Sequence, residues 1–267
     1  LSAATAGASV LAYTRFNFLI DAAFPVLTLL GVGGTGIAQR MIAEYRLKLQ
    51  IRGQFGTYVS PDLVKQLEND PSLLRLGGET KTMTFLFCDI VGFTPISEKL
   101  QEDPQKLVGL INRLLTQLTD CVLSHGGTVD KFMGDCIMAF WGAPMECEDH
   151  AQRAMLASKD MLMLLDDLNS QLDAEDLPHL NVGVGINTGP CVVGNMGSEA
   201  RFDYSVLGDA VNTASRLEGQ TRNYDDWILI GENTAAIEPD WVQYVDAIRV
   251  KGKSEPLNVY TLKDYGS

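Results

Sequence analysis

Several features typical of common functional classes are scarce or missing in this sequence. The five cysteines form no C-x-x-C pair, and neither their odd number nor their spacing fits a zinc site, so we predict reduced, mostly buried thiols. The three histidines are scattered, which favours structural roles for them. Lys and Arg number 21 against 34 Asp and Glu, and the net charge of −13 argues against a nucleic-acid-binding surface. The G-x-x-x-x-G-K-[ST] phosphate-binding loop is also missing.

Charge is nearly missing from the N-terminal part, where Asp21 is the only charged residue between Arg15 and Arg40. We expect residues 1–38 to be a transmembrane region: the tail of one span, then a span at about 17–38, close to the ~20 residues that a bilayer requires. The basic residues that follow, from Arg40 to Arg52, predict that the next part is cytoplasmic. These expectations place the protein at the cell membrane. The alternative is an amphipathic or buried helix of a soluble protein.

Residues 39–78 are predicted to be a helical linker or stalk, which could pair with its copy in a dimer. Because the chain begins inside an apolar region, we also expect an upstream sensor domain that is not in this chain.

From residue 79 onward, apolar runs of strand length alternate with helical patterns. A strand ending at Asp89 precedes a helix that opens at Asp103-Pro104, and residues 128–142 read as a hairpin around Met133-Gly134. A second long helix at about 149–172, a strand at 180–189, a helix at 209–218, a strand and short helix at about 227–237, and two closing strands complete the pattern. We predict an α+β sandwich with helices on at least one face of the sheet.

Two carboxylates lie beside glycine turns at strand ends. Asp89 ends the strand in "FLFCDIVGFT", and Asp135 lies in the hairpin turn. If these strands pair, the carboxylates meet at one end of the sheet, where a cation would relieve their repulsion. Oxygen ligands completed by phosphates are typical of magnesium or manganese. Each aspartate by itself could equally be a simple turn residue.

Three further polar residues have two possible roles each. Lys131 lies on a strand four residues before Asp135 and could simply be solvated. Asn212 and Arg216 share one face of the helix that starts near Asp209. They could form an exposed polar stripe, or they could donate to a phosphate whose charge grows in a transition state.

Together, five segments resemble the class III nucleotidyl cyclase catalytic domain, and specifically the membrane-anchored bacterial adenylyl cyclases of the Thr/Ser subgroup. They are "FCDIVGFTPIS", "GGTVDKFMGDCIMAFWGAP", "GVGINTGPCVVGNMGS", "YSVLGDAVNTASRLE" and "VKGKSEPLNVY". The resemblance covers residues 79–263. It implies a ferredoxin-like core of the βααββαβ type that works as a head-to-tail homodimer, with each active site shared between the subunits.

The resemblance also implies roles for individual residues. Asp89 and Asp135 would bind two Mg²⁺ or Mn²⁺ ions per active site, and the backbone of Ile90, Val91, Gly92, Phe93 and Thr94 would wrap the phosphates of ATP. Lys131 and Ser205 would read the adenine base, and Lys251 would hold the terminal phosphates. Asn212 would orient the ribose, and Arg216 would stabilise charge on the α-phosphate.

These roles describe an adenylyl cyclase that converts ATP to 3′,5′-cyclic AMP and pyrophosphate. Guanylyl members of the family typically carry Glu and Cys at the two base-reading positions, whereas Lys131 with Ser205 fits ATP. The alternatives are a guanylyl cyclase and a catalytically silent module for nucleotide binding or dimerisation. A silent module would usually have lost one of the matched polar residues, and none is lost here.

Overall fold

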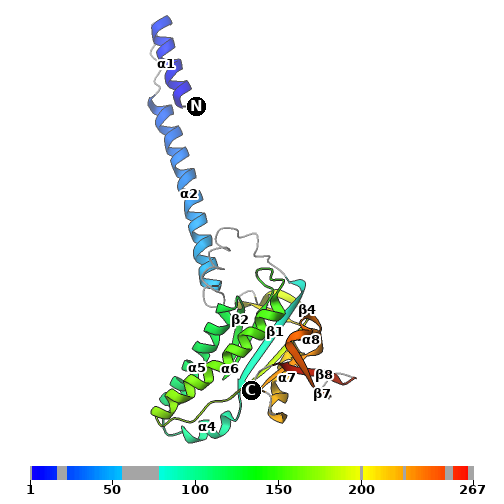
Figure 1. The fold of residues 1–267 in the computed structure, drawn as a ribbon. Coiled ribbons are helices and arrows are strands. Elements are labelled where there is room, and N and C mark those ends of the chain that lie inside the picture. Colours follow the sequence, from blue (N-terminus) through cyan, green and yellow to red (C-terminus); the bar gives the residue numbers. More distant parts are fainter. Residues whose placement is uncertain are drawn as a thin grey trace. The chain divides into compact units, whose positions relative to one another are not determined.

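The computed structural model describes residues 2–16, 23–55, 78–198, 201–224, 227–249 and 255–263 (Figure 1). The chain divides into two units, Leu1–Gly53 and Gln54–Ser267, which are considered separately. Residues 56–77 of the predicted linker or stalk lie outside the described residues.

Among the described residues, the first unit contains helix α1 (Ser2–Phe16) and all of helix α2 (Ala23–Phe55) except its last two residues. The prediction of a transmembrane helix at 17–38 is not supported, because no helix among the described residues is long and apolar enough to cross a membrane. The uncharged part of α2 before Arg40 is short for a span, and four glycines and two threonines dilute its hydropathy. The predicted cellular location stays a prediction.

The second unit contains the predicted strands and helices in the predicted order, together with one short helix and one strand that were not predicted. Its strands are β1 (Glu79–Ile90), β2 (Thr128–Met133), β3 (Cys136–Trp141), β4 (Val182–Ser198), β5 (Arg201–Leu207), β6 (Ile228–Gly231), β7 (Val242–Ile248) and β8 (Leu257–Leu262). Its helices are α4 (Phe93–Lys99), α5 (Pro104–Ser124), α6 (His150–Ala174), α7 (Asp209–Gln220) and α8 (Glu232–Ile237), with 3₁₀ turns η2 (Thr221–Asn223) and η3 (Pro239–Trp241). The order β1-α4-α5-β2-β3-α6-β4 confirms the expected α+β core.

The strands form one mixed sheet in the order β2-β3-β1-β4-β6-β8-β7, and β5 pairs with β4. The central strand β1 is antiparallel to both β3 and β4, whereas β4 and β6 are parallel. Strand β5 and the full length of β4 were not predicted from the sequence. The predicted strand stopped near Pro190, because a proline within glycine-rich sequence usually ends a strand.

Both faces of the sheet are buried, which explains why the β1 sequence is almost continuously apolar. Leu86, Cys88 and Ile90 pack with α5 and α6 on one face, and Figure 1 shows these two helices side by side. Phe85 and Phe87 belong to a second cluster, with α7 on the other face. This layering fixes the end of β1, and with it Asp89, between two packed layers.

We expect Gly185→Ala to destabilise the fold by about 3 kcal/mol, because a buried overlap with backbone cannot relax cheaply. Gly185 lies in β4, and a Cβ atom there would overlap the backbone of Ala214 and Glu218 in α7. Urea unfolding would measure the loss. Gly109→Ala in α5 is the matched control, since its Cβ would meet nothing within 4 Å. That control should stabilise the helix by roughly 0.5–1 kcal/mol. Equal effects at both sites would contradict close β4–α7 packing.

Candidate active site

The two predicted metal-binding aspartates meet at one end of the sheet. Asp89 is the penultimate residue of β1, and Asp135 follows Gly134 in the tight turn between β2 and β3. Gly134 has a φ of 71°, a left-handed conformation that glycine adopts readily. Because β3 pairs with β1, this turn lies beside the end of β1. The two carboxyl groups are close enough to share a hydrogen bond.

The electrostatics of Asp89 reflect this crowding. Burial and, next, the Asp135 carboxylate raise the pKa of Asp89, while the Ile90 N–H and Arg222 oppose the rise. Its Oδ1 atom is buried and has no hydrogen-bond partner among the described residues, whereas Arg222 donates to Oδ2 at 3.2 Å. A buried acceptor without a partner is costly, and a bound cation would satisfy it.

Glu218 and Arg222, which were not predicted from the sequence, stand beside Asp89. Glu218 lies near the C-terminal end of α7, and Arg222 lies one turn later in η2. The Arg222 Nη2 atom lies 3.7 Å from Glu218 Oε1 and also contacts Asp89. Burial and then the Asp89 charge raise the pKa of Glu218 to about 7. The i,i+4 spacing predicts a Glu218–Arg222 pair, but only the β1–α7 packing brings that pair to Asp89.

Without metal, we expect the wild-type protein to lose stability as pH rises from about 4.5 to about 7, and Glu218→Gln to remove part of that loss. A carboxyl group whose pKa is raised by folding binds its proton more tightly in the folded state. Its contribution is therefore fully present below the unfolded pKa and disappears as pH passes the folded value. The shift corresponds to about 3 kcal/mol.

The measurement is urea unfolding in EDTA at several pH values. Glu102→Gln, at an exposed position, is the control and should follow the wild type. If the free energy of unfolding depended on pH in the same way for the wild type and Glu218→Gln, the raised pKa of Glu218 in the folded state would be contradicted.

The donor set of the acidic pair fits a hard divalent cation that is completed by substrate. Among the described residues, no group of three or more His, Cys, Asp and Glu side chains is arranged to hold a metal ion. Mg²⁺ is commonly held by one or two carboxylates together with water and substrate phosphates, so two aspartates and one orphaned oxygen are compatible with it.

The backbone after β1 was predicted to wrap phosphates, and part of it is already engaged within the chain. The Val91 N–H donates to Asn181 O at 2.8 Å. Gly92 has a φ of 72° and precedes α4, whose first turn begins with Phe93 and Thr94. First-turn N–H groups have no acceptor inside their own helix. Phosphate contacts are therefore expected from Gly92 to Thr94.

The predicted base-reading residues come together although they lie 74 positions apart in the sequence. Lys131 extends from β2 and donates to Ser205 Oγ in β5 at 3.2 Å. Ser205 is buried, whereas Lys131 is exposed. Beside them lies Asp130, a buried carboxylate that the sequence analysis did not select.

Asn212 and Arg216 lie one turn apart on α7, as predicted. The Arg216 Nη1 atom is buried and has no hydrogen-bond partner in the part of the chain that the structure describes. Within the described part of this single chain, neither side chain makes a hydrogen bond or ion pair to Asp89, Asp135, Lys131 or Ser205. The predicted residues thus form three groups: the acidic pair, the Lys131–Ser205 pair, and the α7 donors. Lys251 lies outside the described residues.

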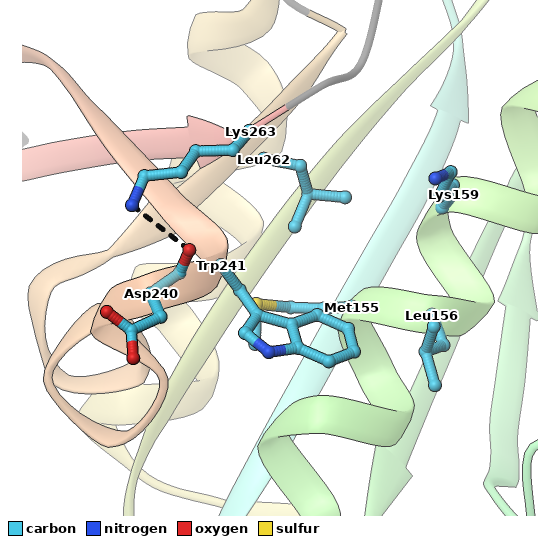
Figure 2. Close-up of a pocket in the computed structure, with 7 residues that line it drawn as sticks. All are labelled: Met155, Leu156, Lys159, Asp240, Trp241, Leu262 and Lys263. Carbon is cyan, nitrogen blue, oxygen red and sulfur yellow. Dashed lines mark hydrogen bonds between the residues drawn. The ribbon is translucent and has the colours of Figure 1, made fainter.

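A pocket of about 340 Å³ lies apart from these groups, between α6 and the end of β8. In Figure 2 the Trp241 ring lies beside Met155, and Lys263 Nζ donates to the Asp240 carbonyl oxygen at 3.0 Å. None of the predicted site residues lines this pocket, so it is not part of the candidate active site.

The remaining thiols and imidazoles agree with the structural roles predicted for them. All five cysteines are free, and Cys88, Cys136 and Cys191 are buried. Burial raises the pKa of the Cys136 thiol to about 12, so this thiol is a poor nucleophile. Each histidine bonds a nearby side chain: His125 to Asp160, His150 to Thr84, and His179 to Asp173.

Comparison with known proteins identifies one family. Residues 78–264 match the family described as the adenylate and guanylate cyclase catalytic domain. Among curated relatives, an adenylate cyclase from Anabaena cylindrica is 34% identical over 80% of this chain and 42% of its own length. Adenylate cyclase 1 from Rhizobium meliloti is 32% identical over 77% of this chain and 31% of its own length. The chain thus spans less than half of these relatives.

Solved structures give the same fold. The adenylyl cyclase CyaB from P. aeruginosa is 37% identical, with a TM-score of 0.66 over 71% of this chain and 97% of that one. The guanylyl cyclase Cya2 is 35% identical, with a TM-score of 0.64 over 72% of this chain and 98% of that one. Overall similarity to solved structures therefore does not distinguish an adenylyl cyclase from a guanylyl cyclase.

Proposed function

Because the chain belongs to the adenylate and guanylate cyclase catalytic domain family, we propose that it converts ATP to 3′,5′-cyclic AMP and pyrophosphate. The family generally uses divalent metal ions, binds a nucleotide substrate and typically acts as a dimer. The choice of ATP over GTP is supported by one observation, the 3.2 Å contact between Lys131 and Ser205. This pair can place an ammonium donor and a hydroxyl against the edge of a purine.

In the proposed reaction, the ribose 3′-oxygen attacks the α-phosphorus and pyrophosphate leaves. Asp89 and Asp135 would hold two Mg²⁺ or Mn²⁺ ions. When bound, these ions would lower the pKa of the 3′-hydroxyl and neutralise charge on the triphosphate. Since the attacking and attacked groups belong to one substrate molecule, the protein mainly positions them and stabilises developing charge.

The α7 residues supply the remaining parts of the proposal. Asn212 would orient the ribose, and Arg216 would donate to the α-phosphate as its charge grows. N–H groups from Gly92 to Thr94 would hold phosphate oxygens, and Lys251 would contact the terminal phosphates. Since the α7 donors make no bond to the acidic pair within one chain, we propose a homodimer whose subunits share two composite sites.

Product identity tests this proposal. The purified protein would be incubated with equimolar ATP and GTP in the presence of Mg²⁺ or Mn²⁺, and cyclic AMP and cyclic GMP would be separated chromatographically. We expect cyclic AMP in excess. Cyclic GMP in excess would keep the mechanism but overturn the assigned substrate. No product with either metal would favour a silent nucleotide-binding module.

A further inference from the structure

Asp130 is a buried carboxylate placed between the two base-reading residues. It is 2% exposed and lies in β2 directly before Lys131. Adjacent residues of a regular strand point to opposite faces of the sheet. The β2–β3 register shifts between Val129 and Lys131, so Asp130 is the extra residue of an irregularity in the ladder. Such bulges redirect side chains, which explains how Asp130 and Lys131 both reach Ser205.

The contacts of Asp130 fix the orientation of the Ser205 hydroxyl. Ser205 Oγ donates to Asp130 Oδ2 at 2.7 Å, and the Val206 N–H donates to the same oxygen at 3.4 Å. Lys131 Nζ lies 3.0 Å from Asp130 Oδ1 and donates to Ser205 Oγ at 3.2 Å. Among these four groups, the carboxylate is the one that can only accept.

The proton and the lone pairs of the Ser205 hydroxyl determine which hydrogen bonds it can make to a ligand. A hydroxyl has one proton and two acceptor lone pairs. The proton of Ser205 is committed to Asp130, and one lone pair faces Lys131. What remains is one acceptor site. The exocyclic 6-amino group of adenine can donate to that site, whereas the 6-oxo group of guanine requires a donor there.

We propose that Asp130 is a specificity-determining positioning residue, which holds the Ser205 hydroxyl as an acceptor and so favours 6-amino over 6-oxo purines. This inference rests on the proposed function. Asp130 itself need not touch the nucleotide, because it acts through the Ser205 proton. A hydroxyl that is free to rotate could donate or accept, and would discriminate less between the two bases.

Asp130→Asn tests the proposal with almost no change of shape. The amide of Asn can donate to Ser205, which releases the hydroxyl proton to serve a 6-oxo group. We expect the ATP-to-GTP ratio of kcat/KM to fall by about tenfold or more, which corresponds to about 1.4 kcal/mol. In a Ser205→Ala background, Asp130→Asn should leave the ratio unchanged. Asp167→Asn, an exposed charge change on α6, is the matched control.

Direct binding separates this inference from the proposed function. The 3′-deoxy forms of ATP and GTP lack the attacking hydroxyl, so calorimetry with them reports base selection even if no turnover occurs. Ser205→Ala alone should weaken 3′-deoxy-ATP and leave 3′-deoxy-GTP unchanged, a result that does not require Asp130→Asn to fold.

Three results would overturn the inference: equal weakening of both nucleotides in Ser205→Ala, an unchanged ratio in a folded Asp130→Asn protein, or binding of neither nucleotide by the wild type. If the wild type makes no product but binds 3′-deoxy-ATP selectively, and Asp130→Asn lowers that selectivity, the proposed catalysis fails and the inference stands.

Discussion

Asp89→Asn should lower kcat by at least about 10²-fold, because it removes the charge of one of the two carboxylates that are proposed to hold the metal ions. The same change should leave the metal-free fold as stable as the wild type or more so. Asp89 is held against Asp135 with its pKa raised by burial and by that neighbour, so replacing it by a neutral amide relieves repulsion. A variant that is stable but inactive would separate function from folding.

Steady-state rates with Mg²⁺ and with Mn²⁺, together with melting temperatures in EDTA and in added Mn²⁺, would measure both effects. Wild-type protein should gain melting temperature from Mn²⁺, and the variant should gain little. Asp167→Asn is again the control, since it alters the same charge at an exposed position. Near-normal turnover by Asp89→Asn would remove Asp89 from the metal site.

Arg216→Ala should lower kcat by about 10²-fold or more with a smaller change in KM, as expected for a donor that acts mainly in the transition state. Its buried Nη1 atom has no hydrogen-bond partner among the described residues, so truncation should leave no described acceptor of this atom unpaired. Arg113→Ala is the control, because Arg113 forms a surface ion pair with Glu175. Equal losses in binding and rate would instead indicate a structural role for Arg216.

Mixing the two inactive variants tests whether sites are shared. In a heterodimer of Asp89→Asn and Arg216→Ala chains, one composite site would carry both defects and the other would be intact. Random exchange should restore roughly a quarter of the wild-type rate, because half of the dimers are mixed and each has one good site. No recovery after verified exchange would contradict composite sites.

The predicted transmembrane helix finds no support among the described residues, and there is a physical reason. Low charge density between Arg15 and Arg40 suggested a span, but spanning requires sustained hydropathy as well as missing charge. Small residues in α2, including Gly33 and Gly34, add length to the helix without adding apolar surface. Such a segment can be uncharged and helical and still fall short of a membrane span.

The sequence by itself determined the order of most strands and helices in the second unit, β5 and α4 excepted, and the residue types available for chemistry. Both follow from short-range signals. Asp103 and Pro104 start α5, and the Asp103 side chain accepts a hydrogen bond from the Lys106 N–H at 3.2 Å. The turn that carries Asp135 belongs to a hairpin, and the local placement of glycine is enough to encode that hairpin.

Tertiary structure decided which of these residues act together. Arg222 reaches Asp89 across 133 positions, and Ser205 reaches Asp130 across 75. The first contact depends on α7 packing against the sheet, and the second on an irregularity in β2 and on the unpredicted strand β5. Periodicity gives the face on which a side chain lies, but a hydrogen-bond partner is set by register and packing between distant segments. Whether the Ser205 hydroxyl donates or accepts a hydrogen bond toward a ligand could therefore be determined only from the folded chain.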